Sequence, residues 1–347
     1  MSPTVLQQKR HQQILSDVVR VYIETGEPVS SRSIARRQAD PLSSATVRNV
    51  MADLEEEGFL YQPHTSAGRV PTAAAYRFFV EQVTAQATAS PEDRQWIRRE
   101  LAAAQTPEAV MERASHVLAA VSCGLGIFIS PPLAQSMVEH LRFLLLPDTR
   151  VLVVLVTAGG LTRDKLMRPE RSFRQEDLDH IAEFLNHHYI GWTLEAMRAD
   201  LRAQLESDRE RYGRMADDAL LLCDPIVLGD IGERKIYVEG AAQFASSPEF
   251  TNQEHLRELL EAIEEKDQLI ALLSGAIEAP EPVHVELGLD KMSNAGKNLA
   301  LVSASYTSKD MAQGTLGILA PMRMHYERVI TAVAFMAQFF SENQEGS

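Results

Sequence analysis

Residues 28–69 concentrate side chains that donate hydrogen bonds to anions, within a chain whose formal net charge is −14. Such side chains bind phosphate oxygens, and arginine and asparagine also form paired hydrogen bonds with base edges in the major groove of DNA. The pattern therefore favours nucleic-acid binding over catalysis. The candidate contact residues are Arg32, Ser33, Arg36, Ser44, Thr46, Arg48, Asn49, His64, Ser66 and Arg69.

The charge is uneven along this acidic chain. Residues 1–80 hold nine Lys/Arg and eight Asp/Glu and carry +1, whereas the remainder carries −15. Residues 28–52 contain four arginines against one acid, Asp40. Because charges are screened over about 8–10 Å at moderate salt, a local basic patch can bind DNA although the whole protein is acidic.

A helix over residues 45–57 must present the central candidates. Ser43 or Ser44 is suited to cap its N-terminus, and Gly58 is suited to end it. The apolar residues at helical spacing form one stripe that predicts a buried face. These residues are Val47, Val50, Met51 and Leu54.

Arg48 and Asn49 fall on the opposite face of this helix, next to the small Ala45 and Ala52. We expect this face to reach base edges and the other candidates to contact the DNA backbone or the minor groove. The alternative is that the two side chains are merely solvated and that Ser43, Ser44 and Thr46 serve only as caps.

The flanking elements support the DNA-binding alternative. Helices are predicted over 7–25 and around Ile34–Ala35, before the helix at 45–57. A short strand at 59–62, the loop PHTSAGR and a return strand into a helix capped by Thr72 follow. This order is typical of a winged helix-turn-helix, in which the second helix of the pair enters the major groove.

Three segments carry a family resemblance: "ILSDVVRVYIETGEPVSSRSIAR", "LSSATVRNVMADLEEEGFLYQPHTSAGRVPT" and "AYRFFV". Together they closely resemble the HrcA family of heat-inducible transcription repressors of bacteria. A weaker resemblance continues through "EFLNHHYIGWTLEAMR", "IYVEGAAQFASSPEF" and "GTLGILAPMRMHYERVI". One departure is Ala75, where the family usually has glycine. Since alanine suits a helix better, we expect no effect.

The resemblance implies a homodimeric repressor of chaperone operons that binds double-stranded DNA at an inverted-repeat operator (CIRCE). It also implies that the GroEL chaperonin helps the repressor to stay active and that heat stress removes that help. The acidic body gives no independent sign of chaperonin binding.

The body is predicted to be an α+β assembly. Strands are predicted at 141–169 and again at 283–322, before a final helix with an apolar stripe from Tyr326 to Phe340. This order indicates a GAF-like α/β domain with an inserted, mostly helical dimerisation subdomain. The predicted division is 1–88 for the winged-helix domain, 89–110 for a linker, 111–171 and 276–345 for the discontinuous GAF-like domain, and 172–275 for the insert.

Other chemistry finds little support. The chain has no long apolar run and no signal-peptide core, and Cys123 and Cys223 lie 100 positions apart, so we expect a reducing cytoplasm. We expect Cys123 to be a buried thiol, and His187 and His188 to be no metal site. No nucleotide fingerprint or catalytic constellation is present, so we expect no enzyme, no cofactor and no metal. The alternative function is a small-molecule-sensing winged-helix regulator that uses the GAF-like pocket.

Overall fold

The computed structural model contains both helices and sheets, which confirms the α+β class. No helix among its described residues is long and apolar enough to cross a membrane. The candidate Ser66 lies outside the described residues. Those described are 9–37, 42–65, 67–84, 89–207, 213–223, 234–250, 257, 260, 261, 263, 265–279, 281–290, 294–309 and 311–342.

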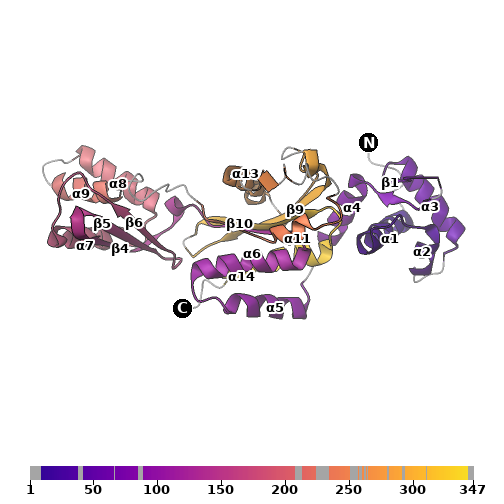
Figure 1. Cartoon of the computed structure of the whole chain (residues 1–347), viewed down its shortest axis with the longest axis horizontal. Helices are drawn as coiled ribbons and strands as arrows, with labels where there is room; N and C mark the ends of the chain where they lie inside the picture. Colours follow the sequence, from indigo (N-terminus) through magenta and orange to yellow (C-terminus); the bar gives the residue numbers. More distant parts are fainter. Residues whose placement is uncertain are drawn as a thin grey trace.

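Three units follow one another along the long axis of the molecule (Figure 1). We call them the N-terminal unit (9–84), the central unit around a five-stranded sheet, and the distal unit (133–223) around a three-stranded sheet. The N-terminal unit and the distal unit lie at opposite ends of the molecule (Figure 1). Any signal between them must therefore cross the central unit.

The N-terminal unit is three helices, a small hairpin and a fourth helix. Val18, Leu54 and Phe79, from three different helices, are at most 1% exposed and meet in its core. Its elements are α1 (Lys9–Thr25), α2 (Ser31–Arg37), α3 (Ser44–Glu56), β1 (Leu60–Tyr61), β2 (Val70–Pro71) and α4 (Ala73–Thr84).

The central unit is built on an antiparallel sheet with strand order β7-β3-β10-β9-β8. Alternate residues of each strand face opposite sides. Phe128 and Leu316 pack in one core with α6 and α14, whereas Ile127 and Leu319 pack in another with α13. Figure 1 shows α6 and α14 on one side of the sheet and α13 on the other. The sheet is thus a middle layer.

The elements of the central unit come from distant parts of the chain. Its strands are β3 (Leu125–Ile129), β7 (Ile236–Glu239), β8 (His284–Leu287), β9 (Leu299–Thr307) and β10 (Gln313–Pro321). Its helices are α5 (Pro91–Ala102), α6 (Pro107–Ser122), α11 (Ala241–Ala245), α13 (Lys266–Glu278), η4 (Asn294–Asn298) and α14 (Tyr326–Glu342).

The distal unit has its own sheet and its own core. Leu141 and Leu155 of the sheet are fully buried with Leu178 and Leu185 of α7. The other face of this sheet carries half-exposed and exposed side chains. The elements are η2 (Leu133–Gln135), β4 (Val138–Leu145), η3 (Pro147–Thr149), β5 (Val151–Thr157), β6 (Thr162–Met167), α7 (Gln175–Tyr189), α8 (Leu194–Ser207) and α9 (Gly213–Cys223).

The observed strand pairing corrects the predicted division of the body. Strands 138–167, assigned from sequence to the GAF-like domain, form a separate sheet that packs on α7. Conversely, strand 236–239 and most of helix 266–278 fall within the predicted insert at 172–275 but belong to the five-stranded sheet and its cover. The reason is that strand 236–239 pairs with β3, which lies more than a hundred residues earlier in the chain. No local sequence pattern predicts a pairing between such distant segments.

Two smaller expectations are also corrected. Cys123 is exposed rather than buried, because it ends α6 in a left-handed conformation with φ 55°. Thr72 precedes α4 as expected, but its hydroxyl donates to the carbonyl oxygens of Gly58 and Phe59 at 2.8 and 3.0 Å. It therefore ties the return strand to the end of α3 instead of capping α4.

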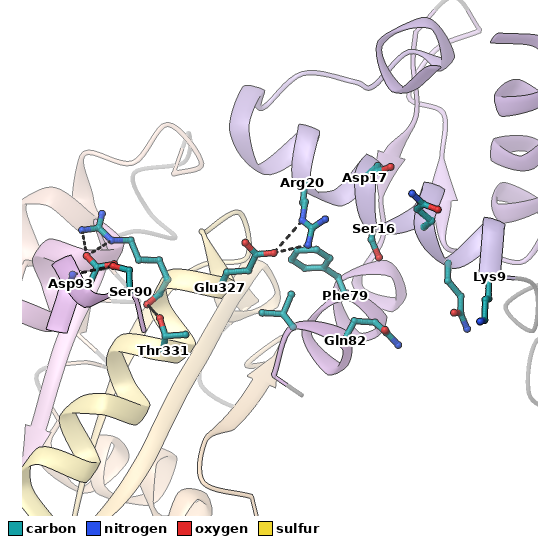
Figure 2. Close-up of a pocket in the computed structure, with 14 residues that line it drawn as sticks. Lys9, Ser16, Asp17, Arg20, Phe79, Gln82, Ser90, Asp93, Glu327 and Thr331 are labelled. Atoms are coloured by element: carbon teal, nitrogen blue, oxygen red, sulfur yellow. Dashed lines mark hydrogen bonds and ion pairs between the residues drawn. The ribbon is translucent and has the colours of Figure 1, made fainter. Parts of the chain in front are cut away.

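The N-terminal unit is held against the central unit. Tyr326 at the start of α14 is buried against Tyr76 and Phe79 of α4, with ring centres 6.0 and 6.4 Å apart. Arg20 donates to Glu327 at 2.7 Å across a polar hollow of 710 Å³, as Figure 2 shows. One side of α1 and α4 is thus turned toward the central unit.

Candidate nucleic-acid interface

Helix α3 has the two faces that its sequence predicted. The Ser43 hydroxyl accepts the backbone N–H of Thr46 at 3.0 Å, which caps the helix. Arg48 and Asn49 are exposed on the face away from the core. The buried stripe consists of Val47, Val50, Met51 and Leu54, which confirms the predicted core face.

Helix α2 lies against α3 and adds two exposed cations. Ile34 is fully buried and anchors the helix, which leaves Arg32 and Arg36 exposed. The Ser30 hydroxyl accepts the backbone N–H of Ser33 at 3.1 Å, and the Ser33 hydroxyl donates to the Ser30 carbonyl at 2.7 Å. Ser30 therefore caps α2, and the hydroxyl of Ser33, predicted as a DNA contact, is hydrogen-bonded to that capping residue.

The loop between β1 and β2 is fixed from inside by a glutamine that sequence reasoning missed. The Gln62 amide donates to the carbonyl oxygens of Thr65 and Ala67 at 3.0 and 2.8 Å. Gly68 passes so close to the chain before α2 that an added Cβ would lie 2.4 Å from the Val29 carbonyl oxygen. No spacing rule reveals either contact, because both depend on how the loop folds back.

Arg69 has a partner within the protein. Its guanidinium lies 2.8 Å from the Glu55 carboxylate at the end of α3, and the two side chains are 19% and 32% exposed. Its backbone exchanges two hydrogen bonds of 2.8 Å with Val29. Arg69, predicted as a DNA contact, thus joins the hairpin to α3 and to the loop before α2.

A hollow of 480 Å³ connects these elements. Its lining includes Ser30 and Ser31 at the start of α2, Arg48 of α3, and Gln62 and Thr65 of the hairpin loop. The structure therefore brings Arg48 together with the hairpin. His64 is exposed on the loop, and Ser44 and Thr46 lie in the first turn of α3.

The charges favour the N-terminal half of α3 as the anion-facing end. Backbone N–H groups at a helix N-terminus attract anions, whereas Glu55, Glu56 and Glu57 stand at the other end. Arg37 is ion-paired with Glu24 at 2.7 Å, and its hydrogen bond holds the pKa of that carboxyl below its usual value. Arg32, Arg36 and Arg48 have no acidic partner within the described part of the chain.

Among the described residues, no group of three or more His, Cys, Asp or Glu side chains is placed to hold a metal ion. The rings of His187 and His188 meet edge to face, with ring centres 5.0 Å apart, on the exposed side of α7.

Comparison with known proteins defines the class of protein first. Residues 108–330 match the family model described as HrcA protein C terminal domain. The chain is 34% identical over 339 residues to the heat-inducible transcription repressor HrcA of Geobacter sulfurreducens, covering 97% of this chain and 98% of that protein. It is 32% identical to the repressor of the same name from Xylella fastidiosa strain M12, covering 97% and 95%. Both relatives are named as transcription repressors.

The chain belongs to the HrcA family of heat-inducible transcription repressors. A solved structure, described as a hypothetical protein at 2.2 Å resolution, has the same overall fold with a TM-score of 0.64 and 21% identity. That similarity covers 97% of this chain and 98% of the solved one.

Proposed function

We propose that the N-terminal unit is a winged helix-turn-helix and that the central unit is a GAF-like domain. The protein then represses heat-inducible operons as a homodimer on an inverted-repeat operator, CIRCE. The observation that carries the proposal is that Arg48 and Asn49 are exposed on one face of α3, whereas the opposite face of this helix is buried in the core. A reading helix needs this combination, because base contacts require side chains held in place by a rigid support.

The roles divide between base reading and positioning. Arg48 and Asn49 reach base edges. The backbone and minor-groove contacts come from Arg32, Ser33, Arg36, Ser44, Thr46, His64 and Ser66. Arg69, which the sequence grouped with them, acts by holding the hairpin against Glu55.

Fluorescence anisotropy on an operator duplex tests these roles. Arg48→Ala should weaken operator binding by about 1–3 kcal/mol and relax the preference at one base pair. Arg36→Ala should weaken binding to all sequences alike and lower the salt slope by about one unit. Arg77→Ala on the exposed side of α4 is the matched control. If Arg48→Ala left affinity and preference unchanged, α3 would not be the reading helix.

The open face of the distal sheet is the surface that we propose for the dimer. Leu144 and Leu166 are 39% and 46% exposed, and both flank Leu152 in one cross-strand row. The next row is Arg142, Val154 and Asp164. An apolar row of this kind on a sheet face is typical of a surface that packs against another sheet.

The charges on this face are self-complementary under one arrangement. A two-fold axis parallel to the strands places β4 of one copy over β6 of the other. Arg142 then faces Asp164 of the partner subunit, and the leucine rows meet. An axis across the strands would instead place β4 over β4 of the other copy, so that Arg142 would not face Asp164. Two N-terminal units would then be carried at a fixed spacing, as an inverted repeat requires.

Light scattering tests the interface. Leu166→Lys should give a monomer with much weaker operator binding, because it places a charge in the apolar row. Glu183→Lys, on the exposed side of α7, adds the same residue away from the sheet face and should remain dimeric. A Leu166→Lys protein that stayed dimeric would exclude this face.

Heat inactivation needs no dedicated chemical group on this proposal. Loss of about 1.4 kcal/mol of stability lowers the ratio of folded to unfolded protein tenfold, so a marginally stable repressor loses operator binding on mild heating. GroEL with ATP should then restore binding by refolding, as the family resemblance implies. A gel shift after a short heat step, with and without GroEL and ATP, tests this. Full recovery on cooling alone would argue against a role for the chaperonin.

A further inference from the structure

An apolar hollow lies where the central unit meets the distal unit, far from the N-terminal unit. Its volume is 280 Å³, just below the range of about 300–1,000 Å³ typical of sites for drug-sized ligands. Ligand sites are common at such junctions between structural units. The lining residues come from both units: Leu101, Phe339 and Phe340 belong to the central unit, and Ser136, Gly159 and Leu161 belong to the distal unit.

The wall on the central side is fixed in place. The Phe340 ring at the end of α14 lies 4.7 Å from the Phe128 ring and 5.5 Å from the Tyr306 ring, measured between centres. The Ser341 hydroxyl accepts the backbone N–H of Thr307 at 3.2 Å. The end of α14 is therefore attached to the end of β9, and the aromatic wall is preformed.

The wall on the distal side is the turn between β5 and β6. Leu161 is only 7% exposed, and it packs in the core of the central unit although its chain segment belongs to the distal unit. The Thr157 backbone N–H donates to the Leu161 carbonyl at 2.9 Å, which closes the turn. A Cβ added to Gly160 would lie 3.5 Å from the Pro107 ring, so the turn is in contact with the start of α6.

The polar groups of the lining define the charge of a ligand. Lys309, which is exposed, is the one charged side chain among the described lining residues, and Ser136 and Ser308 add hydroxyls. We propose that this hollow binds a small anionic amphiphile, with a short apolar body among the leucine and phenylalanine side chains and one carboxylate at Lys309.

Such a ligand would lie at one end of two helices whose other ends meet the N-terminal unit. Arg328 of α14 pairs with Asp93 of α5 at 3.0 Å beside that unit, whereas Leu101 and Phe339 of the same helices line the hollow. The ligand would also join the central unit to the distal unit. If the distal unit holds the dimer, as proposed above, occupancy would set the spacing of the two N-terminal units.

Calorimetry on the full chain tests binding without any DNA. The probes are octanoate, 1-octanol and octylammonium, which share an apolar body and differ in charge. We expect saturable binding that is tightest for octanoate and weakest for octylammonium. Lys309→Glu should reverse the order of the two ions, whereas Lys297→Glu, at a different hollow, should not. Lys309→Ala should weaken octanoate binding about two- to fivefold, as for an exposed ion pair.

Two filled variants locate the site. Val110→Phe and Ala102→Phe each place a ring at the wall and should abolish binding of all three probes. Ala103→Phe, one residue outside the lining, should bind them normally. Absence of saturable binding to the unmodified chain would overturn the proposal. So would probe binding that persists in both the Val110→Phe and the Ala102→Phe variants, or binding that shows no preference for octanoate. Since no outcome involves the operator, a failure here would leave the proposed repressor function intact.

Discussion

The ion pair between Arg69 and Glu55 gives the sharpest test of how the hairpin is held. Arg69→Ala removes a contact of 2.8 Å between side chains that are 19% and 32% exposed. Exposed pairs contribute about 0–1 kcal/mol, and breaking a buried pair costs about 3–5 kcal/mol. Since the Arg69–Glu55 pair is partly buried, Arg69→Ala should lower the free energy that holds the hairpin against α3 by an intermediate amount of about 1–2 kcal/mol. The backbone hydrogen bonds to Val29 need no side chain and should survive.

Hydrogen–deuterium exchange of a peptide covering residues 59–72 measures this loss. A change of one to two kcal/mol in local opening corresponds to exchange about 5–30 times faster. In a double-mutant cycle with Glu55→Gln, the two changes should be far from additive, because they remove the same contact. The salt slope of operator binding should stay the same. Unchanged exchange together with a salt slope lower by about one unit would refute this reasoning and make Arg69 a phosphate contact.

Two further outcomes are expected in the N-terminal unit. Gly68→Ala should release the hairpin from the loop before α2 and weaken operator binding, because the added Cβ would overlap the Val29 carbonyl oxygen. Hydrogen–deuterium exchange measures the release of the hairpin, and fluorescence anisotropy measures operator binding. Unchanged exchange of the hairpin would contradict the close approach of Gly68 to Val29. The lowered pKa of Glu24 means that its ion pair with Arg37 stabilises the fold fully above the usual glutamate pKa. This stabilisation is lost as the pH falls through the lowered pKa. The free energy of unfolding, measured as a function of pH, should therefore show a small decrease in this acid range, and Glu24→Gln should remove that decrease.

Local patterns predicted the N-terminal unit closely. The apolar stripe at 47–54, the cap at Ser43 and the positive-φ Gly58 define α3 almost to the residue, because each acts within one or two helical turns. The exposure of Arg48 and Asn49 follows from the same stripe, since a helix with one buried face has an opposite face in water.

The body was harder to predict because its pairings are not local. The strand at 125–129 escaped notice: its five residues are buried on both faces and show no alternation. It lies between β7 and β10, which come more than a hundred residues later in the chain.

The sequence by itself determined the helices, most strands, the family and the helix face that carries Arg48, since each depends on neighbours in the chain or on matching motifs. Tertiary structure alone decided which strands share a sheet, where the distal unit begins, and that Arg69 is paired with an acidic side chain. Arg69 illustrates the reason. Its charge was visible in the sequence, but whether that charge meets phosphate or Glu55 depends on a contact that only the folded hairpin creates.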